Sequence, residues 1–327
     1  MFPFILHPSS FILPPIAFIQ VDLDGLWAVR RCYGGRGTPD EDDPVYSRAL
    51  PALLDLFDEV AVQATFFVGG ADAQVAWKCR HLAAAVERGH ELANHSMTHD
   101  LGLSGLEPAQ RAGISPAIFA LEKEIADCQE ALKKAFGIEA RGFRAPGFGF
   151  SLSFLKTLDR LGFWYDSSLL PSPWGWVMRW ITRRISASPL RDKSQYGSAG
   201  GWRAPLRPRP TTPDGRLWEI PVSVTRRLRL PFHGGVGFLL GKRWVERAVH
   251  SLGRGIGFLN YLIHGMDVVD GREWDVVPNG KGQKFFAGGT RERLVFFTEI
   301  CKTIRKVFEI RRTDQWVEQA RTSVKNR

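Results

Sequence analysis

The hydrophobic pattern alternates short, buried-type runs with amphipathic runs from residue 16 onward. The first run, 16–21 (IAFIQV), has the continuous apolar character of a strand that is covered on both faces. The run 50–59 (LPALLDLFDE) instead places its apolar residues at helical spacing. The same criteria predict strands at 61–68, 90–93, 140–143, 163–165, 217–224 and 259–263, and helices at 72–88, 116–136 and 153–161. Strand–helix alternation over this length predicts an α/β fold with a largely parallel sheet, a distorted (β/α) barrel.

The pattern predicts a single barrel domain at 16–315. It carries an insertion around 171–216, between a loose N-terminal tail at 1–15 and a basic C-terminal tail at 316–327. Prolines interrupt the apolar N-terminus, and no Lys or Arg occurs before Arg30. We therefore expect neither a signal peptide nor a membrane span there.

Composition narrows the class of protein but not its partner. The chain has 327 residues, 44% of them hydrophobic, which excludes a disordered or fibrous protein. Its 44 Lys and Arg against 34 Asp and Glu give a net charge of +10, which would attract nucleic acid, a phosphorylated substrate or a membrane surface. The basic residues are scattered without a nucleic-acid motif, so we expect no nucleic-acid partner. Four separated cysteines without a CxxC pair favour a reducing, cytoplasmic location.

Candidate chemistry is concentrated where the predicted strands end. Asp22 and Asp24 project to the same side of the first strand because side chains alternate along it. His95 and His99 are four residues apart, the spacing of one face of a helical turn, and Asp24 would supply a third metal ligand. One carboxylate and two imidazoles with an open position are typical of a catalytic zinc-type site. Taken singly, the aspartate motif could be a turn aspartate beside a solvated one, and the histidine motif could be an ordinary surface pair.

Three later strand ends also carry polar residues. Arg144 precedes a stiff Pro-Gly turn that would aim its guanidinium at a carboxylate, although it could equally be a surface arginine. Asp166 follows the strand at 163–165, and His264 follows the strand at 259–263. A histidine in that position is often only a core residue with satisfied hydrogen bonds.

Together these motifs resemble the polysaccharide deacetylases, or NodB-like carbohydrate esterases. The resemblance covers about residues 16–270 and rests on VDLDG at 21–25, TFFVG at 65–69, HSMTH at 95–99, RAPG at 144–147, Asp166 with Trp174, and LIH at 262–264. The family has adjacent aspartates in its first motif, as general base and metal ligand, whereas Leu23 stands in the base position here. Intracellular branches of the family are similar to this chain in carrying Asp-x-Asp.

The resemblance implies a metal-dependent hydrolase that removes an N-acetyl or N-formyl group from an aminosugar. Asp24, His95 and His99 would hold a divalent metal, for which we expect zinc. Asp22 would be the general base, Arg144 would keep it ionised, and His264, oriented by Asp166, would protonate the leaving amine. Pro146, Trp174 and Leu262 would contact the substrate.

Two other functions remain open from the sequence. A cyclic amide or ureide hydrolase would use a similar site, and Leu23 would also suit a non-catalytic carbohydrate- or lipid-binding member. The segment 174–185 places Trp176, Trp180 and two isoleucines on an apolar arc with arginines beside it. This pattern fits either an insertion packed on the barrel or a peripheral contact with the inner membrane face, where the substrate would be a glycolipid. No oligomeric state is predicted.

Overall fold

The structure is a computed structural model, and it describes residues 15–100, 116–149, 152–175, 177, 180, 199–270 and 289–325. The predicted N-terminal tail, apart from Pro15, and the whole segment 181–198 within the predicted insertion lie outside these residues. Within the described residues, no helix combines the length and hydropathy that crossing a membrane would require.

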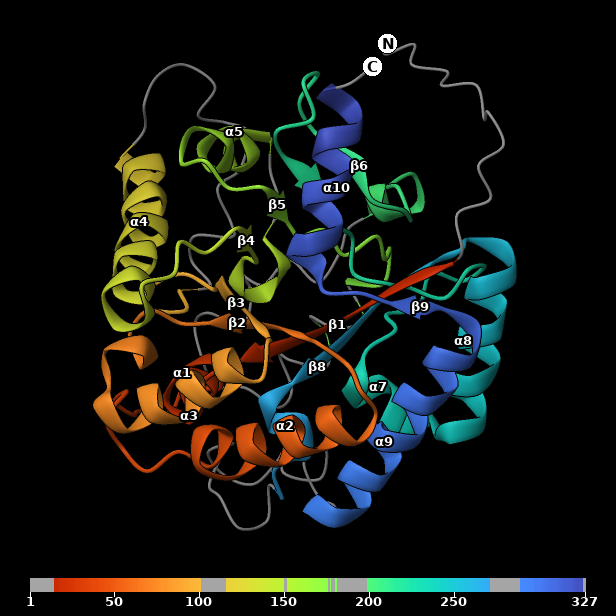
Figure 1. The fold of residues 1–327 in the computed structure, drawn as a ribbon, viewed down its shortest axis with the longest axis horizontal. Helices are drawn as coiled ribbons and strands as arrows, with labels where there is room; N and C mark the ends of the chain where they lie inside the picture. The colour runs from red at the N-terminus through yellow and green to blue at the C-terminus, as the bar shows by residue number, and fades with distance from the viewer. Residues whose placement is uncertain are drawn as a thin grey trace.

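A curled, mostly parallel sheet forms the centre of the molecule (Figure 1). Its strands are β1 (Ile16–Leu23), β2 (Thr65–Val68), β3 (Glu91–Asn94), β4 (Gly142–Phe143), β5 (Tyr165–Asp166), β6 (Arg209–Pro210), β7 (Trp218–Glu219), β8 (Phe258–His264) and β9 (Glu309–Ile310). The strand order is β6-β7-β5-β4-β3-β2-β1-β8, with β9 paired to the start of β1, and the pair β6–β7 is antiparallel. The predicted distorted (β/α) barrel is confirmed as the fold.

Helices surround this sheet (Figure 1). The α-helices are α1 (Leu26–Cys32), α2 (Leu50–Glu59), α3 (Ala76–Glu87), α4 (Pro116–Phe136), α5 (Leu152–Arg160), α7 (Gly234–Leu240), α8 (Lys242–Gly255), α9 (Thr290–Val307) and α10 (Thr313–Lys325). Short helical turns are η1 (Val45–Ala49), η2 (Asp72–Gln74), η5 (Pro146–Phe148), η7 (Ala199–Trp202) and η8 (Gly265–Val268). The helices α2 and α4 match the predicted ranges, whereas α7 to α10 were not predicted.

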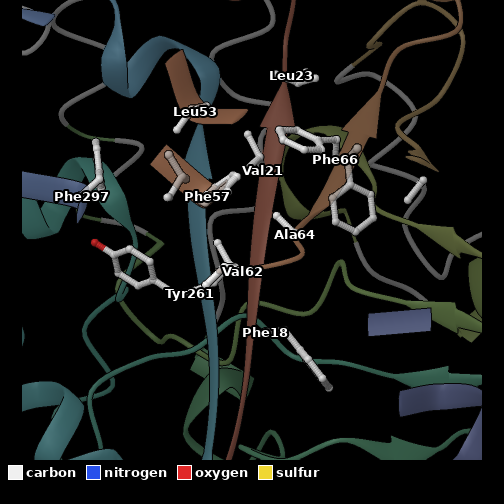
Figure 2. Packing of buried hydrophobic residues seen from close by; sticks show 14 of the residues in the cluster. Phe18, Val21, Leu23, Leu53, Phe57, Val62, Ala64, Phe66, Tyr261 and Phe297 are labelled. Atoms are coloured by element: carbon white, nitrogen blue, oxygen red, sulfur yellow. The ribbon is translucent and has the colours of Figure 1, made fainter. Parts of the chain in front are cut away.

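The hydrophobic core lies largely between the sheet and its outer helices. On β1, Val21 and Leu23 belong to the same buried cluster as Leu53 and Phe57 of α2 (Figure 2). The alternate β1 residues, Gln20 and Asp22, are also buried but contact polar side chains instead. Because parallel strands are covered on both faces, β1 is a nearly continuous apolar run. Its two polar residues form hydrogen bonds with buried polar side chains.

Several predicted boundaries differ from the structure. The strand predicted at 61–68 begins at Thr65, because Ala61 has a positive φ of 48° in the turn that follows α2. The strand predicted at 217–224 is paired as a strand only over Trp218–Glu219. The predicted C-terminal tail is instead part of α10 as far as Lys325, and Trp316 packs edge-on against Phe18.

Candidate active site

Three potential metal ligands meet at the carboxyl ends of β1 and β3. One oxygen of Asp24, Oδ1, lies 3.0 Å from Nε2 of His95 and 3.1 Å from Nε2 of His99. Among the described residues, these three side chains form the group whose geometry could hold a metal ion. Burial raises the pKa of Asp24, but the His99 charge and the contacts from both imidazoles lower it well below its usual value. The charge of Asp24 conversely raises the pKa of His99, although burial alone would lower it.

The donor chemistry of this triad fits a divalent cation. Nδ1 of His95 lies 2.8 Å from the carbonyl oxygen of Arg144 and donates its proton there, which leaves the lone pair on Nε2. That lone pair faces a carboxylate oxygen only 3.0 Å away. Two lone pairs at this distance repel each other unless a proton or a metal cation lies between them. The triad therefore has the donor set and the orientation of a metal site.

The two histidines converge through a loop, not through the predicted helical turn. Ser96 and His99 have positive φ values of 64° and 52°, which lie outside the right-handed α-helical region. The loop is held by α4, where the carboxylate of Glu124 accepts hydrogen bonds from the Thr98 amide (2.8 Å) and hydroxyl (2.9 Å). The two histidines therefore converge as the spacing predicted, but they do so along a loop and not on a helical turn.

Asp22 and Arg144 form a buried ion pair beside this triad. Nη1 of Arg144 lies 2.6 Å from Oδ1 of Asp22, and the arginine side chain is fully buried. Its other donors reach Gln20 and the carbonyl and hydroxyl oxygens of Ser167, so the guanidinium is fixed on all sides. The predicted contact between Arg144 and the Asp22 carboxylate is present in the structure.

His264 faces the second oxygen of Asp22. Its Nε2 lies 3.8 Å from Asp22 Oδ2, and its Nδ1 lies 3.6 Å from Asp267 Oδ2. The same Asp267 oxygen accepts the His264 amide at 2.9 Å, so the turn η8 fixes the carboxylate. Burial lowers the pKa of His264, but Asp267 and then Asp22 raise it to about 9. The imidazole is therefore protonated at neutral pH.

Asp166 does not take the predicted place beside His264. Its Oδ1 accepts a hydrogen bond of 2.5 Å from Ser168, and it is aligned with Glu219 across the β5–β7 pair. Burial raises the pKa of Asp166 to about 6, and burial together with the Asp166 charge raises the pKa of Glu219 well above its usual value. Ser168 in turn accepts a hydrogen bond from the amide of Ala145, so the Asp166–Ser168 contact supports the loop that carries Arg144. The carboxylate that orients His264 is that of Asp267.

The three residues predicted to contact substrate occupy different environments. Pro146 is buried at the start of η5, and Leu262 is buried on β8 in a small cluster with Phe148. Trp174 donates its indole N–H to the Leu228 carbonyl at 2.7 Å. Of the predicted membrane segment 174–185, most lies outside the described residues, but Trp180 is described and is 52% exposed.

A buried lysine supports the chain just after β1. Nζ of Lys78 lies 2.7 Å from Asp43 and 2.6 Å from Asp72, and all three side chains are buried. Asp43 accepts the amide of Leu26, and Asp72 accepts the indole N–H of Trp27. This cluster therefore fixes α1, the element that directly follows Asp24.

Comparison with known proteins relates the middle of the chain to one protein family. Residues 41–165 match the model of the polysaccharide deacetylase family. The match covers less than half of the chain. The matched range includes His95, His99 and Arg144. Asp22, Asp24 and His264 lie outside it, and the fold brings them to the same site.

Two curated relatives of this chain are chitooligosaccharide deacetylases. The protein from Bradyrhizobium sp. is 42% identical over 90 residues, which cover 26% of this chain and 40% of the relative. The protein from Sinorhizobium fredii is 39% identical over 97 residues, which cover 27% of this chain and 42% of the relative. The chain thus spans about two fifths of the curated relatives that it matches.

Solved structures support the fold over nearly the whole chain. A Mycobacterium smegmatis protein described as a polysaccharide deacetylase superposes with a TM-score of 0.57 at 19% identity, covering 97% of this chain and 94% of the other. A Pseudomonas aeruginosa protein described in the same way gives a TM-score of 0.56 at 13% identity, covering 95% and 93%. At these identities the likeness establishes the shared fold alone.

Sequence reasoning missed two residues of the site. Asp267 follows His264 by three residues, a spacing that would have signalled a side chain able to turn back onto it. His233 stacks edge-on against His264, with ring centroids 5.8 Å apart, and burial and the neighbouring His264 charge lower its pKa to about 4. It precedes α7 and aligns with Leu262 of β8, a pairing that no local pattern signals.

Proposed function

We propose that this protein is a metal-dependent hydrolase that removes an N-acyl group from an aminosugar. The single observation that carries the proposal is the triad of Asp24, His95 and His99 beside a buried aspartate–arginine pair and a protonated histidine. The names of its curated relatives support an N-acetylated oligosaccharide as the substrate class.

Asp24, His95 and His99 would hold the metal, for which we propose zinc because of the mixed nitrogen and oxygen donors. When bound, a divalent cation lowers the pKa of water and polarises an acyl carbonyl. The hydrogen bond from His95 to the Arg144 carbonyl supports this role, since it keeps Nε2 available as a ligand.

Asp22 would accept the proton of the attacking water. Arg144 occupies Oδ1 of Asp22, so Oδ2 is the oxygen left to act as the base. The arginine pairs with this carboxylate at 2.6 Å and fixes its orientation. This arrangement supplies the base that Leu23, in the family's usual position, cannot provide.

His264 would donate a proton to the departing amine. Its Nε2 faces Asp22 Oδ2 across 3.8 Å, so the acid and the base would flank the same scissile bond. Asp267 holds Nδ1 and stabilises the imidazolium form that a general acid requires. The products would be a free amine and acetate or formate.

We further propose a cytoplasmic location and a glycolipid substrate. All four cysteines are free in the structure, which supports a reducing compartment. Exposed Trp180 supports contact of the segment 174–185 with the membrane face. Vesicle binding that is unchanged in a Trp180→Ser variant would contradict that contact.

Two variants test the catalytic roles separately. Asp22→Asn should keep the metal and lose about 10²–10⁴-fold in rate, since it removes the general base. His264→Ala should mainly slow substrates whose amine is a poor leaving group. Assays on N-acetyl and N-formyl aminosugars and on cyclic amides would identify the acyl class. A metal-loaded wild type with no turnover of any of them would make the chain a binding member of its family.

A further inference from the structure

Helix α8 presents a line of basic side chains to solvent. Arg243, Arg247, His250 and Arg254 follow one another at intervals of four, three and four residues, and all four are exposed. These intervals place them on one face of the helix. The opposite face is buried against the core through Val245, Ala248, Val249 and Leu252.

Two exposed leucines adjoin the start of this line. Leu239 and Leu240 end α7, and they are 70% and 48% exposed. Gly241, with a φ of 85°, joins α7 directly to α8 without any linker. The leucines therefore lie next to Arg243, at the N-terminal end of the basic line.

The first two arginines are available to a partner. Among the residues that the structure describes, no side-chain hydrogen bond or ion pair engages the guanidinium group of Arg243 or of Arg247. By contrast, Lys242 on the adjoining face is bound to Glu299 of α9 at 3.0 Å. The basic line is thus distinct from the ion-paired side of α8.

We propose that the α7–α8 surface, formed by Leu239, Leu240, Arg243, Arg247 and Arg254, docks the protein on an anionic lipid bilayer. Arginines complement the anionic headgroups, and the paired leucines can enter the apolar boundary beneath them. A nucleic acid or an acidic glycan would use the arginines but offers no apolar layer to the leucines. The observations therefore favour a membrane over other polyanions.

The position of α7 connects this surface to the catalytic residues. His233 immediately precedes α7 and stacks on His264. A bilayer in contact with the far end of this two-turn helix would lie beside the edge of the site. This deepens the glycolipid proposal made above, although docking itself requires no catalysis.

Vesicle co-sedimentation of the full chain, without substrate, tests the surface. We expect the wild type to bind vesicles of phosphatidylcholine with phosphatidylglycerol, and Arg243→Gln/Arg247→Gln to weaken binding about 25-fold, roughly fivefold per arginine. Leu239→Ser/Leu240→Ser should weaken it at least about tenfold. The matched control, Lys123→Gln/Lys134→Gln, removes the same charge from exposed positions on α4, across the molecule from α8, and should bind as the wild type does (Figure 1).

Three results would overturn the proposal. They are no vesicle binding by the wild type at low salt, an equal loss in the α4 control, and undiminished binding by the leucine variant. The last result, together with tight binding of RNA or heparin, would assign the surface to a soluble polyanion. Because the assay involves no turnover, its failure would leave the proposed hydrolase activity standing, and a failure of activity would leave docking intact.

Discussion

Replacing Asp267 with asparagine should shift the alkaline limit of activity to lower pH. The pKa of His264 is about 9, and Asp267 is the main group that raises it. Without that charge, the pKa should fall toward the ordinary value of about 6.5. The protonated fraction at pH 8 would then drop from about 90% to about 3%, so the rate should fall about 30-fold at pH 8 and less than twofold at pH 6.

The assay is a profile of kcat/KM between pH 5.5 and 10. Asparagine keeps an oxygen that can accept the His264 amide, so Asp267→Asn should preserve the turn η8. The matched control is Asp166→Asn, which removes a carboxylate that contacts Ser168 rather than His264. An unchanged alkaline limb in Asp267→Asn, or the full shift in Asp166→Asn, would refute the assignment of Asp267 as the orienting residue.

Three further predictions concern the metal site and the buried charges. His95→Ala and His99→Ala should each lose bound metal without unfolding, and full occupancy by metal analysis in both would disprove the ligand assignment. Lys78→Met leaves two buried carboxylates without their cation, so chemical denaturation should show a loss of about 3–5 kcal/mol. Burial raises the pKa of Glu91 to about 8, so the folded state binds more protons than the unfolded state between about pH 4.5 and 8. Stability should therefore fall as pH rises through that window, and the Glu91-dependent part of this slope should vanish in Glu91→Gln.

The convergence of the candidate site was predictable because it depends on sheet topology. Asp24 and His95 directly follow β1 and β3, which are separated only by β2 in the parallel sheet, so their side chains meet when the strands are in register. Alternation along β1 likewise predicted that Asp22 and Asp24 share a side. Neither inference needed the path of the loops.

The errors arose where loops and helix contacts decide the geometry. The partner of His264 depends on the turn η8, which returns Asp267 to the histidine, whereas Asp166 is held by its register with Glu219. Positive φ values at Ser96 and His99 are set by contacts to α4, which the spacing of histidines does not reveal. The tail prediction failed for a similar reason. The many charged residues of α10 make its apolar side hard to recognise in the sequence. That side packs on the core through Trp316, which contacts Phe18.

The central claim is that a metal held by Asp24, His95 and His99 is required for N-deacylation. The most direct measurement is the rate of acetate release from an N-acetylated chitooligosaccharide as zinc is titrated into chelator-treated protein. The account predicts no activity in the metal-free protein and full recovery at one metal per chain, with no recovery in His95→Ala. Deacetylation at the wild-type rate by protein shown to be metal-free would contradict it.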